Sequence, residues 1–321
     1  MDIGEIVGKT AIEVMKNGDA RNTATGVMGI LFPYAGVTKQ AVDLYIDEIK
    51  KSNLSPEVKT FLILNVKKTI KGLKNQKTIA DIAMKNAKAG TDFSDKSGVN
   101  EEWLDRFMDS ARFVSSESIQ IIWGKILANE FETPGATPPN MIRILSEFTP
   151  DLAKIFGKIC SMKVLLCPLS DKGDIEAYVP RILVPYIMNE EKMNQLGLTF
   201  DMLNELEILG VIKQEILKGY IIQGVEEEKI VIAINNELEL ISEHEKGKLP
   251  IGNVLLTSVG KALQKIIDTE DIPGYQDMVK EYLKVSRVQL AEKHDYIVRN
   301  GGDEITIQKE QNLSEKETGE N

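Results

Sequence analysis

The fold is clearest in residues 101–162, whose sequence is EEWLDRFMDSARFVSSESIQIIWGKILANEFETPGATPPNMIRILSEFTPDLAKIFGKICSM. Apolar residues recur there three and four positions apart, which is the spacing of an amphipathic helix. Residues that favour helix starts precede each of four apolar runs: Asn100, Ser115 or Ser116, Thr137-Pro138-Pro139, and Thr149-Pro150. We therefore predict a central module over residues 100–162, in which four short helices pack as a bundle.

Four residues of this module stand out chemically: Trp123, Glu130, Pro134 and Gly135. Trp123 lies on the apolar stripe of the second helix and is interpreted as a core anchor, the alternative being a ring that stacks on a ligand. Glu130 lies one step further along that stripe. Its carboxylate is expected to bond an N-terminal helix end, with the helix after Pro138 as the candidate. The alternative role, a catalytic acid, lacks a visible partner residue, and Pro134-Gly135 is expected to end the helix.

The order of these residues resembles a known bacterial family. The resemblance is carried by Trp123 to Glu130, Pro134-Gly135, Arg143 to Leu145, and Asp151 to Phe156. It is similar to the family catalogued as domain of unknown function 2806, which resembles in style the abortive-infection alpha proteins. The resemblance implies a helical core and, by analogy, a role in defence against phage. It supplies no catalytic residues.

The composition describes an acidic globular chain of 321 residues with a formal net charge of -10. Such a chain is repelled by phosphate backbones unless basic charge gathers on one face, so we expect no general nucleic-acid binding. The residues Cys160, Cys167, His244 and His294 lack metal-ligand spacing. We expect no metal, no cofactor and a reducing cytoplasm. The first residues lack the basic start of a signal peptide.

Residues 1–90 form a predicted N-terminal helical arm, which a linker rich in Gly, Ser and Asp separates from the module. Its unusual segment is ATGVMGILFPYAGV at residues 24–37, which carries no charge. The segment is too short to span a bilayer, which needs about 20 apolar residues. A buried loop-helix is one interpretation, and a membrane or oligomer contact is the other. The candidate contact residues are Gly26, Val27, Met28, Gly29, Ile30, Leu31, Phe32 and Tyr34.

A helix predicted to start at Ser55-Pro56 is basic, although the chain as a whole is acidic. Its polar face carries six lysines: Lys59, Lys67, Lys68, Lys71, Lys74 and Lys77. A solvated helix face is one interpretation. The other is contact with anionic lipid, nucleic acid or an acidic partner.

After Met162 the apolar pattern changes to short β-branched runs, and we predict an α+β domain over residues 163–298. Its order of helix, strands and helix resembles winged-helix domains. The residues that carry this resemblance are Leu203, Leu206, Leu209, Gly210, Val211, Ile212, Leu256, Thr257, Gly260 and Leu263. The helix that would read DNA has acidic residues and no Arg or Lys, which favours protein contacts over DNA. The polar residues 299–321 are predicted to form a disordered tail.

The predicted fold class is mainly α, and α+β overall, with the helical bundle followed by a winged-helix-like domain. None of the common hydrolase, nucleotide-binding or zinc-protease motifs occurs, so we expect no enzyme. The leading hypothesis is a non-enzymatic antiphage protein of the abortive-infection type. It would sense a phage component through protein contacts and act by self-assembly as a homo-oligomer, in the cytoplasm or at the inner membrane face. The alternative is a soluble winged-helix regulator or scaffold that binds another protein.

Overall fold

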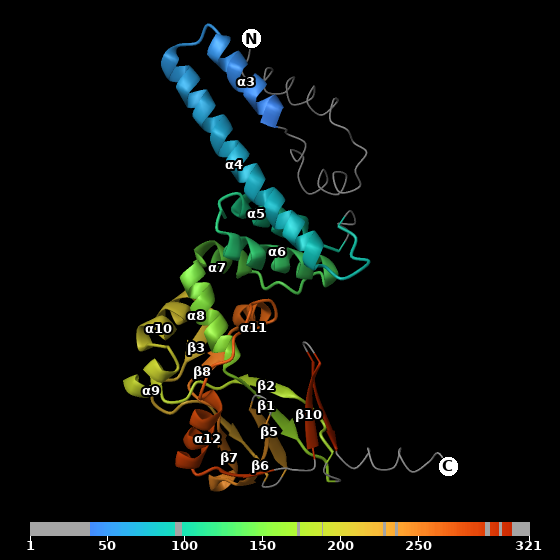
Figure 1. Ribbon diagram of the computed structural model, residues 1–321, viewed down its shortest axis with the longest axis vertical. Coiled ribbons are helices and arrows are strands. Elements are labelled where there is room, and N and C mark those ends of the chain that lie inside the picture. Colours follow the sequence, from blue (N-terminus) through green and yellow to red (C-terminus); the bar gives the residue numbers. More distant parts are fainter. Residues whose placement is uncertain are drawn as a thin grey trace, which may run out of the picture. The chain divides into compact units, whose positions relative to one another are not determined.

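The computed structural model describes residues 39–93, 98–171, 174–187, 189–226, 229–234, 237–292, 296–301 and 304–309. The fold class is α+β, as predicted, with helices first and antiparallel sheets after them. Contacts between residues divide the chain into two compact units, Met1–Pro150 and Asp151–Asn321 (Figure 1). Each unit is described by itself.

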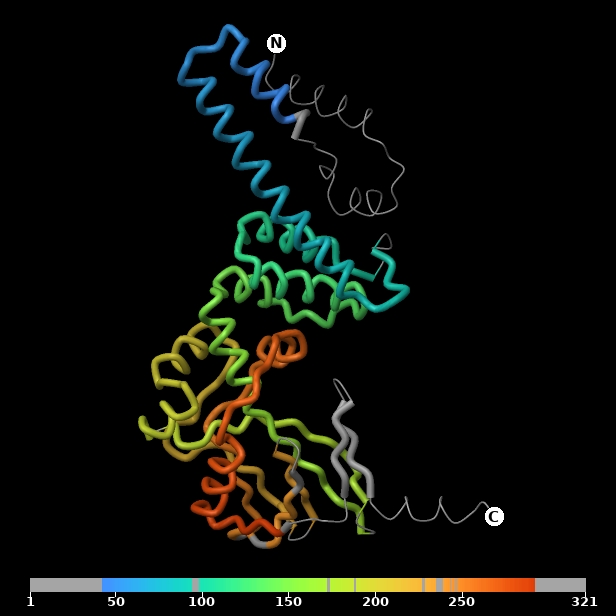
Figure 2. The backbone as a smooth tube through the Cα atoms, in the orientation of Figure 1, coloured from blue at the N-terminus to red at the C-terminus, as the bar shows by residue number. Residues whose placement is uncertain are grey.

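The first unit contains helices that can be followed along the chain in Figure 2. Their bounds are α3 (Lys39–Lys51), α4 (Pro56–Asn86), α5 (Glu101–Ala111), α6 (Glu117–Glu132) and α7 (Met141–Glu147). Two of the predicted caps are present. Ser55 accepts a hydrogen bond from the Val58 amide at 3.4 Å, and Asn100 accepts one from the Trp103 amide at 2.9 Å.

Helix α4 is a single helix of 31 residues that starts, as predicted, after Ser55. Polar residues in its middle are bonded to the rest of the unit. The side chain of Asn75 donates to the Arg112 carbonyl at 2.9 Å, and that of Gln76 donates to the Met108 carbonyl at 2.7 Å. These tertiary bonds satisfy polar groups that would otherwise favour a break in the helix.

The core of the first unit lies where α4 crosses α6. Trp123 is fully buried, and its ring lies 4.7 Å from that of Phe107. Gly124 faces α4 so closely that an added Cβ would lie 2.4 Å from Cγ2 of Ile82. The absence of a side chain at Gly124 is therefore what allows the two helices to approach.

We predict that Gly124→Ala destabilises the protein by about 1–3 kcal/mol, because the added methyl overpacks the contact with Ile82. Helix propensity alone would give the opposite sign, since Ala stabilises a helix interior by about 1 kcal/mol relative to Gly. Urea denaturation measures the difference. Ser118→Ala, at an exposed position of α6, is the control and should change stability by less than about 0.5 kcal/mol. A Gly124→Ala variant as stable as the wild type would contradict the proposed close contact.

The second unit begins with α8 (Pro150–Ser161), a helix that the sequence groups with the central module. The C-terminal end of α8 is bonded to residues of this unit. The Ser161 hydroxyl accepts a hydrogen bond from the Glu270 amide at 3.0 Å. Just after α8, the hydroxyl of the buried Tyr275 lies 2.9 Å from the carbonyl oxygens of both Met162 and Leu183. These contacts fix the junction between α8 and the sheet.

The main sheet is antiparallel, with the strand order β2-β1-β5-β6-β9. Its strands are β1 (Lys163–Pro168), β2 (Val179–Ile182), β5 (Ile230–Ile234), β6 (Glu237–Glu243) and β9 (Gln289–Glu292). Helix α12 (Tyr275–Val285) lies on one face of the sheet. There the Lys280 Nζ lies 2.6 Å from Oε1 of the buried Glu239 of β6.

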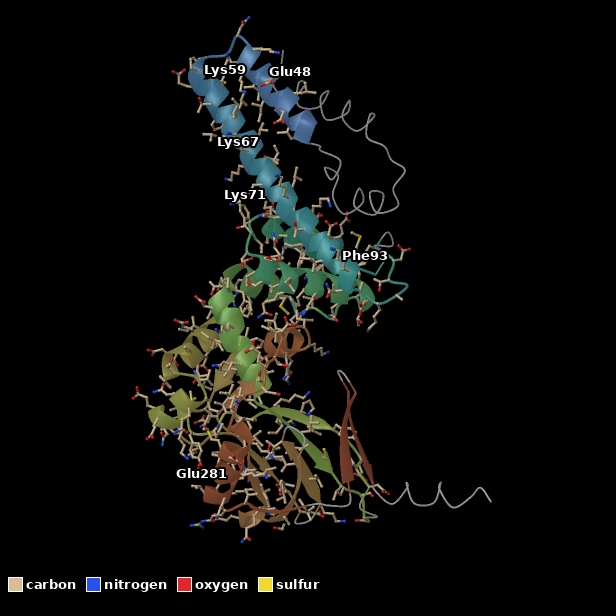
Figure 3. All side chains as sticks on the ribbon, viewed as in Figure 1. Glu48, Lys59, Lys67, Lys71, Phe93 and Glu281 are labelled. Atoms are coloured by element: carbon tan, nitrogen blue, oxygen red, sulfur yellow. The ribbon has the colours of Figure 1, made fainter. Side chains whose placement is uncertain are left out.

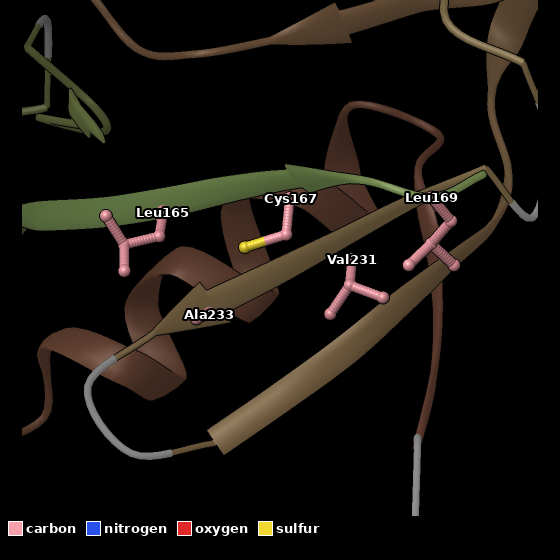
Figure 4. Packing of buried hydrophobic residues seen from close by; sticks show 5 residues of the cluster. All are labelled: Leu165, Cys167, Leu169, Val231 and Ala233. Carbon is pink, nitrogen blue, oxygen red and sulfur yellow. The ribbon is translucent and has the colours of Figure 1, made fainter. Parts of the chain in front are cut away.

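The opposite face of the sheet carries a compact apolar cluster (Figure 4). Its members are Leu165, Cys167, Leu169, Val231 and Ala233. Alternate residues of β1 and β5 point to the same face, and the strand register places Cys167 opposite Val231. Burial raises the pKa of the Cys167 thiol to about 11, so this thiol stays protonated at neutral pH.

Shorter elements complete the second unit. They are α9 (Glu190–Gln195), α10 (Phe200–Leu209), β3 (Ile212–Gln214), β4 (Ile221–Gln223), η1 (Glu245–Gly247), β7 (Lys248–Pro250), β8 (Val254–Leu256) and α11 (Ser258–Gln264). Strand β3 pairs with β8, and β4 pairs with β7. Thr199 and Thr257 cap α10 and α11, and Gly210 ends α10 with a φ of 95°. The sequence predicts these three helix boundaries.

The C-terminal segment differs from its prediction. The sequence predicts a disordered tail from residue 299, but β10 (Tyr296–Gly301) and β11 (Glu304–Lys309) pair as antiparallel strands. The sequence contains β-branched residues on both sides of Gly301-Gly302-Asp303, a pattern typical of a hairpin. The prediction of disorder was based on the polar composition of the whole segment and did not take this hairpin pattern into account.

Candidate functional site

Four residues singled out in the central module have structural roles in the first unit: Trp123, Glu130, Pro134 and Gly135. Glu130 is only 3% exposed. Its Oε1 accepts a hydrogen bond from the Gly135 amide at 2.7 Å, and its Oε2 accepts one from the Thr137 amide at 3.0 Å. Both donors lie in the loop between α6 and α7, and not at the start of α7 at Met141 as the sequence predicts.

The loop geometry explains this difference. Gly135 has a φ of 81°, a left-handed conformation that glycine adopts without strain. Pro134 packs on Gly98, where an added Cβ would lie 2.8 Å from the proline ring. Glu130 therefore holds the chain that leaves α6, and Trp123 is a core residue of the same helix.

We predict that Glu130→Gln costs about 1–3 kcal/mol, because an amide side chain cannot accept both loop hydrogen bonds and leaves a buried amide unpaired. Urea denaturation at neutral pH measures this cost. Glu147→Gln is the matched control. It loosens an exposed pair with Arg143 and should change stability by less than about 1 kcal/mol. Equal effects of the two substitutions would argue against a structural role for Glu130.

The apolar segment 24–37, with its candidate contact residues, lies outside the described residues. A membrane or oligomer contact by Gly26, Val27, Met28, Gly29, Ile30, Leu31, Phe32 and Tyr34 therefore stays a prediction.

The described surface that stands out is the N-terminal half of α4. Phe61 is 65% exposed and Leu64 is 60% exposed. Positions 61, 64, 68 and 71 follow the helical period, so Lys68 and Lys71 lie on the same side as the two apolar residues. Lys67 adjoins them. Figure 3 shows Lys67 and Lys71 along α4. We call Phe61, Leu64, Lys67, Lys68 and Lys71 the α4 face.

No carboxylate among the described residues pairs with the lysines of this face. In the part of the chain that the structure describes, the ammonium groups of Lys67, Lys68 and Lys71 have no ion-pair partner, whereas Lys77 pairs with Asp81 at 2.8 Å. Helix α4 contains seven lysines and two carboxylates. The Lys59 ammonium differs, because it donates to the Lys50 carbonyl at 2.8 Å.

The exposure of Phe61 and Leu64 follows from how little of α4 its neighbours cover. The buried residues of α4 all lie in its C-terminal half, where α6 packs: Gly72, Asn75, Ile79, Ala80 and Ala83. The N-terminal half packs on α3, which has only 13 residues, through partly buried side chains such as Leu62 and Val66. No described element covers the side turned away from α3, and this side is the α4 face.

Two further properties bear on function. Within the described ranges, no group of His, Cys, Asp and Glu side chains is arranged to hold a metal ion. Every helix among those residues is too short or too polar to cross a bilayer.

Together these features define an α+β protein with a helical first unit, a sheet in its second unit and a basic, partly apolar surface on α4. The chain belongs to the family described as Protein of unknown function (DUF2806), which matches residues 65–280. This match confirms the family resemblance of the central module and extends it into both units. Searches of curated proteins and of solved structures find no match to the chain.

Proposed function

We propose that the chain is a non-enzymatic antiphage protein of the abortive-infection type. It senses a phage component through protein contacts, assembles into a homo-oligomer and acts at the cytoplasmic face of the membrane. The defence role rests on analogy with the abortive-infection alpha proteins, which the family resembles in style. The membrane step is supported by one observation: lysines that have no ion-pair partner among the described residues lie beside the exposed Phe61 and Leu64.

Both kinds of residue on the α4 face favour an anionic bilayer surface. Each lysine held near such a surface contributes about 1 kcal/mol of binding free energy. Phe and Leu side chains add apolar area that enters the boundary between head groups and acyl chains. A surface with three lysines and two apolar side chains therefore combines the two signals that peripheral attachment requires.

We predict that the protein co-sediments with vesicles of phosphatidylglycerol and phosphatidylethanolamine, and not with vesicles of phosphatidylcholine alone. The triple substitution Lys67→Ala, Lys68→Ala and Lys71→Ala should weaken binding roughly a hundredfold, since about 3 kcal/mol is lost. Phe61→Ser with Leu64→Ser should weaken it by about tenfold or more.

The control for the lysine variant is Lys154→Ala, Lys213→Ala and Lys261→Ala, which removes the same charge from exposed sites of the second unit. This control should bind anionic vesicles about as well as the wild type. Equal losses in both triple variants would show that net charge alone drives binding. Full phage protection by the α4-face variants, measured by plating efficiency, would refute the membrane step.

A second candidate function is a regulator or scaffold with a winged-helix-like domain that binds another protein. It is supported by α10, whose solvent-facing side combines Asp201 and Glu205 with an 83% exposed Ile208. An apolar residue among acids suits a protein partner, whereas the acids repel phosphates.

For this candidate we predict no retardation of duplex DNA by the protein at physiological salt in a gel shift, because α10 offers no cation to a phosphate. Ile208→Asp should then reduce co-purification of a partner, while Lys213→Asp on the neighbouring strand should not. A salt-dependent gel shift would instead favour a DNA-binding regulator.

A further inference from the structure

The second unit contains an open pocket of about 430 Å³ that is separate from the α4 face. Its wall is formed by the segment between β3 and β4, by β7 and by the end of α12. Three apolar residues of this segment and of β4 line it although solvent reaches them: Ile216 is 36% exposed, Leu217 is 87% exposed, and Ile221 at the start of β4 is 45% exposed. Such exposure costs free energy unless something covers it.

Two tyrosines form another wall of the pocket. The rings of Tyr186 and Tyr282 lie edge to face, with centroids 5.5 Å apart. The hydroxyl of Tyr186 is buried and has no hydrogen-bond partner among the residues that the structure describes. Burial, and after it the charge of Glu281, raises the pKa of Tyr186, so this hydroxyl is a neutral donor at physiological pH. A buried donor without an acceptor can gain a hydrogen bond from a ligand.

The backbone around the pocket is strained. Tyr186 has a φ of 59° and Arg287 a φ of 61°, and among the described residues they are the two outside glycine with positive φ. Tyr186 lines the pocket, and Arg287 follows Ser286, which also lines it. Strained residues of this kind cluster at binding sites, because the surrounding structure must hold them.

The charged groups of the pocket leave a local excess of positive charge. Lys218 and Lys248 line it, and their ammonium groups have no partner in the described part of the chain. The one carboxylate among the lining residues, that of Glu245, pairs with Arg287 at 3.1 Å. The lining therefore has two lysines without a described partner beside its apolar wall.

We propose that this pocket binds a small amphiphilic organic anion. The aliphatic or aromatic body of the ligand would cover Ile216, Ile221 and the tyrosine rings, and its anionic head would lie between Lys218 and Lys248. The volume lies within the range of small-molecule pockets, about 300–1,000 Å³. The inference does not depend on the membrane or defence role.

The test uses the full chain and the fluorescent fatty acid cis-parinarate, with its methyl ester as the uncharged probe. We expect saturable binding of the acid. Lys218→Glu with Lys248→Glu should weaken it by more than about tenfold, and should weaken ester binding by less than about threefold. Ile216→Ala with Ile221→Ala should weaken both probes by about tenfold.

The matched control, Lys213→Glu with Lys261→Glu, changes two exposed lysines of the same unit that do not line the pocket, and it should bind both probes like the wild type. Melting curves verify that each variant is folded. The proposal is overturned if the wild type does not bind cis-parinarate, or if the pocket variants bind it as tightly as the control. Direct binding of an acidic leucine-containing peptide, without any binding of the fatty acid, would assign the pocket to a protein partner and also overturn it.

Discussion

The first unit depends on the close approach of α4 and α6 at Gly124. Without a side chain there, α6 comes near enough for Ile82 and the Ile79 carbonyl to touch its backbone surface. This contact aligns Trp123 and Phe107 in one core, and Glu130 then fixes the direction in which the chain leaves α6. Because the contact engages only the C-terminal half of α4, the remaining turns have α3 as their one neighbour among the described elements. The basic and apolar α4 face is a consequence of that asymmetry.

The second unit shows a similar relation between a tight contact and an open surface. Gly260 lies so close to the Val211 carbonyl that an added Cβ would be 2.0 Å from its oxygen, which holds α11 against the start of β3. Beyond β3 the chain leaves its ladder with β8, and from β4 on it pairs with β7. Between the two strands, the Glu215 amide donates to the Asn253 carbonyl at 2.9 Å and the Tyr220 amide donates to the Gly252 carbonyl at 2.8 Å. Asn253 holds this irregular segment by donating to the Glu215 carbonyl at 2.6 Å. The apolar residues that the segment exposes line the pocket.

Local chemistry is what the sequence predicts well. Asn100, Thr199, Gly210 and Thr257 act within a turn of their own position, so their roles as caps and stops can be read directly. The exposure of Phe61 and Leu64 cannot be read in this way, because periodicity identifies an apolar stripe without showing how far a partner helix covers it. The pocket was missed for a related reason: its lining residues are spread from Tyr186 to Ser286 and meet only in the fold. The terminal hairpin was not predicted, because the composition of its segment is polar.

Helix α4 also has a mechanical consequence. Its 31 residues form one uninterrupted helix, capped at Ser55 and held near its middle by the bonds of Asn75 and Gln76. Its C-terminal half is fixed against α6, and its N-terminal half extends beyond that contact. A sideways force on the lysine-bearing N-terminal half therefore bends the helix most strongly where it packs on α6. There Ile79 and Ile82 are in close contact with Gly124. The contact that stabilises the unit is also the contact that such a force would disturb first.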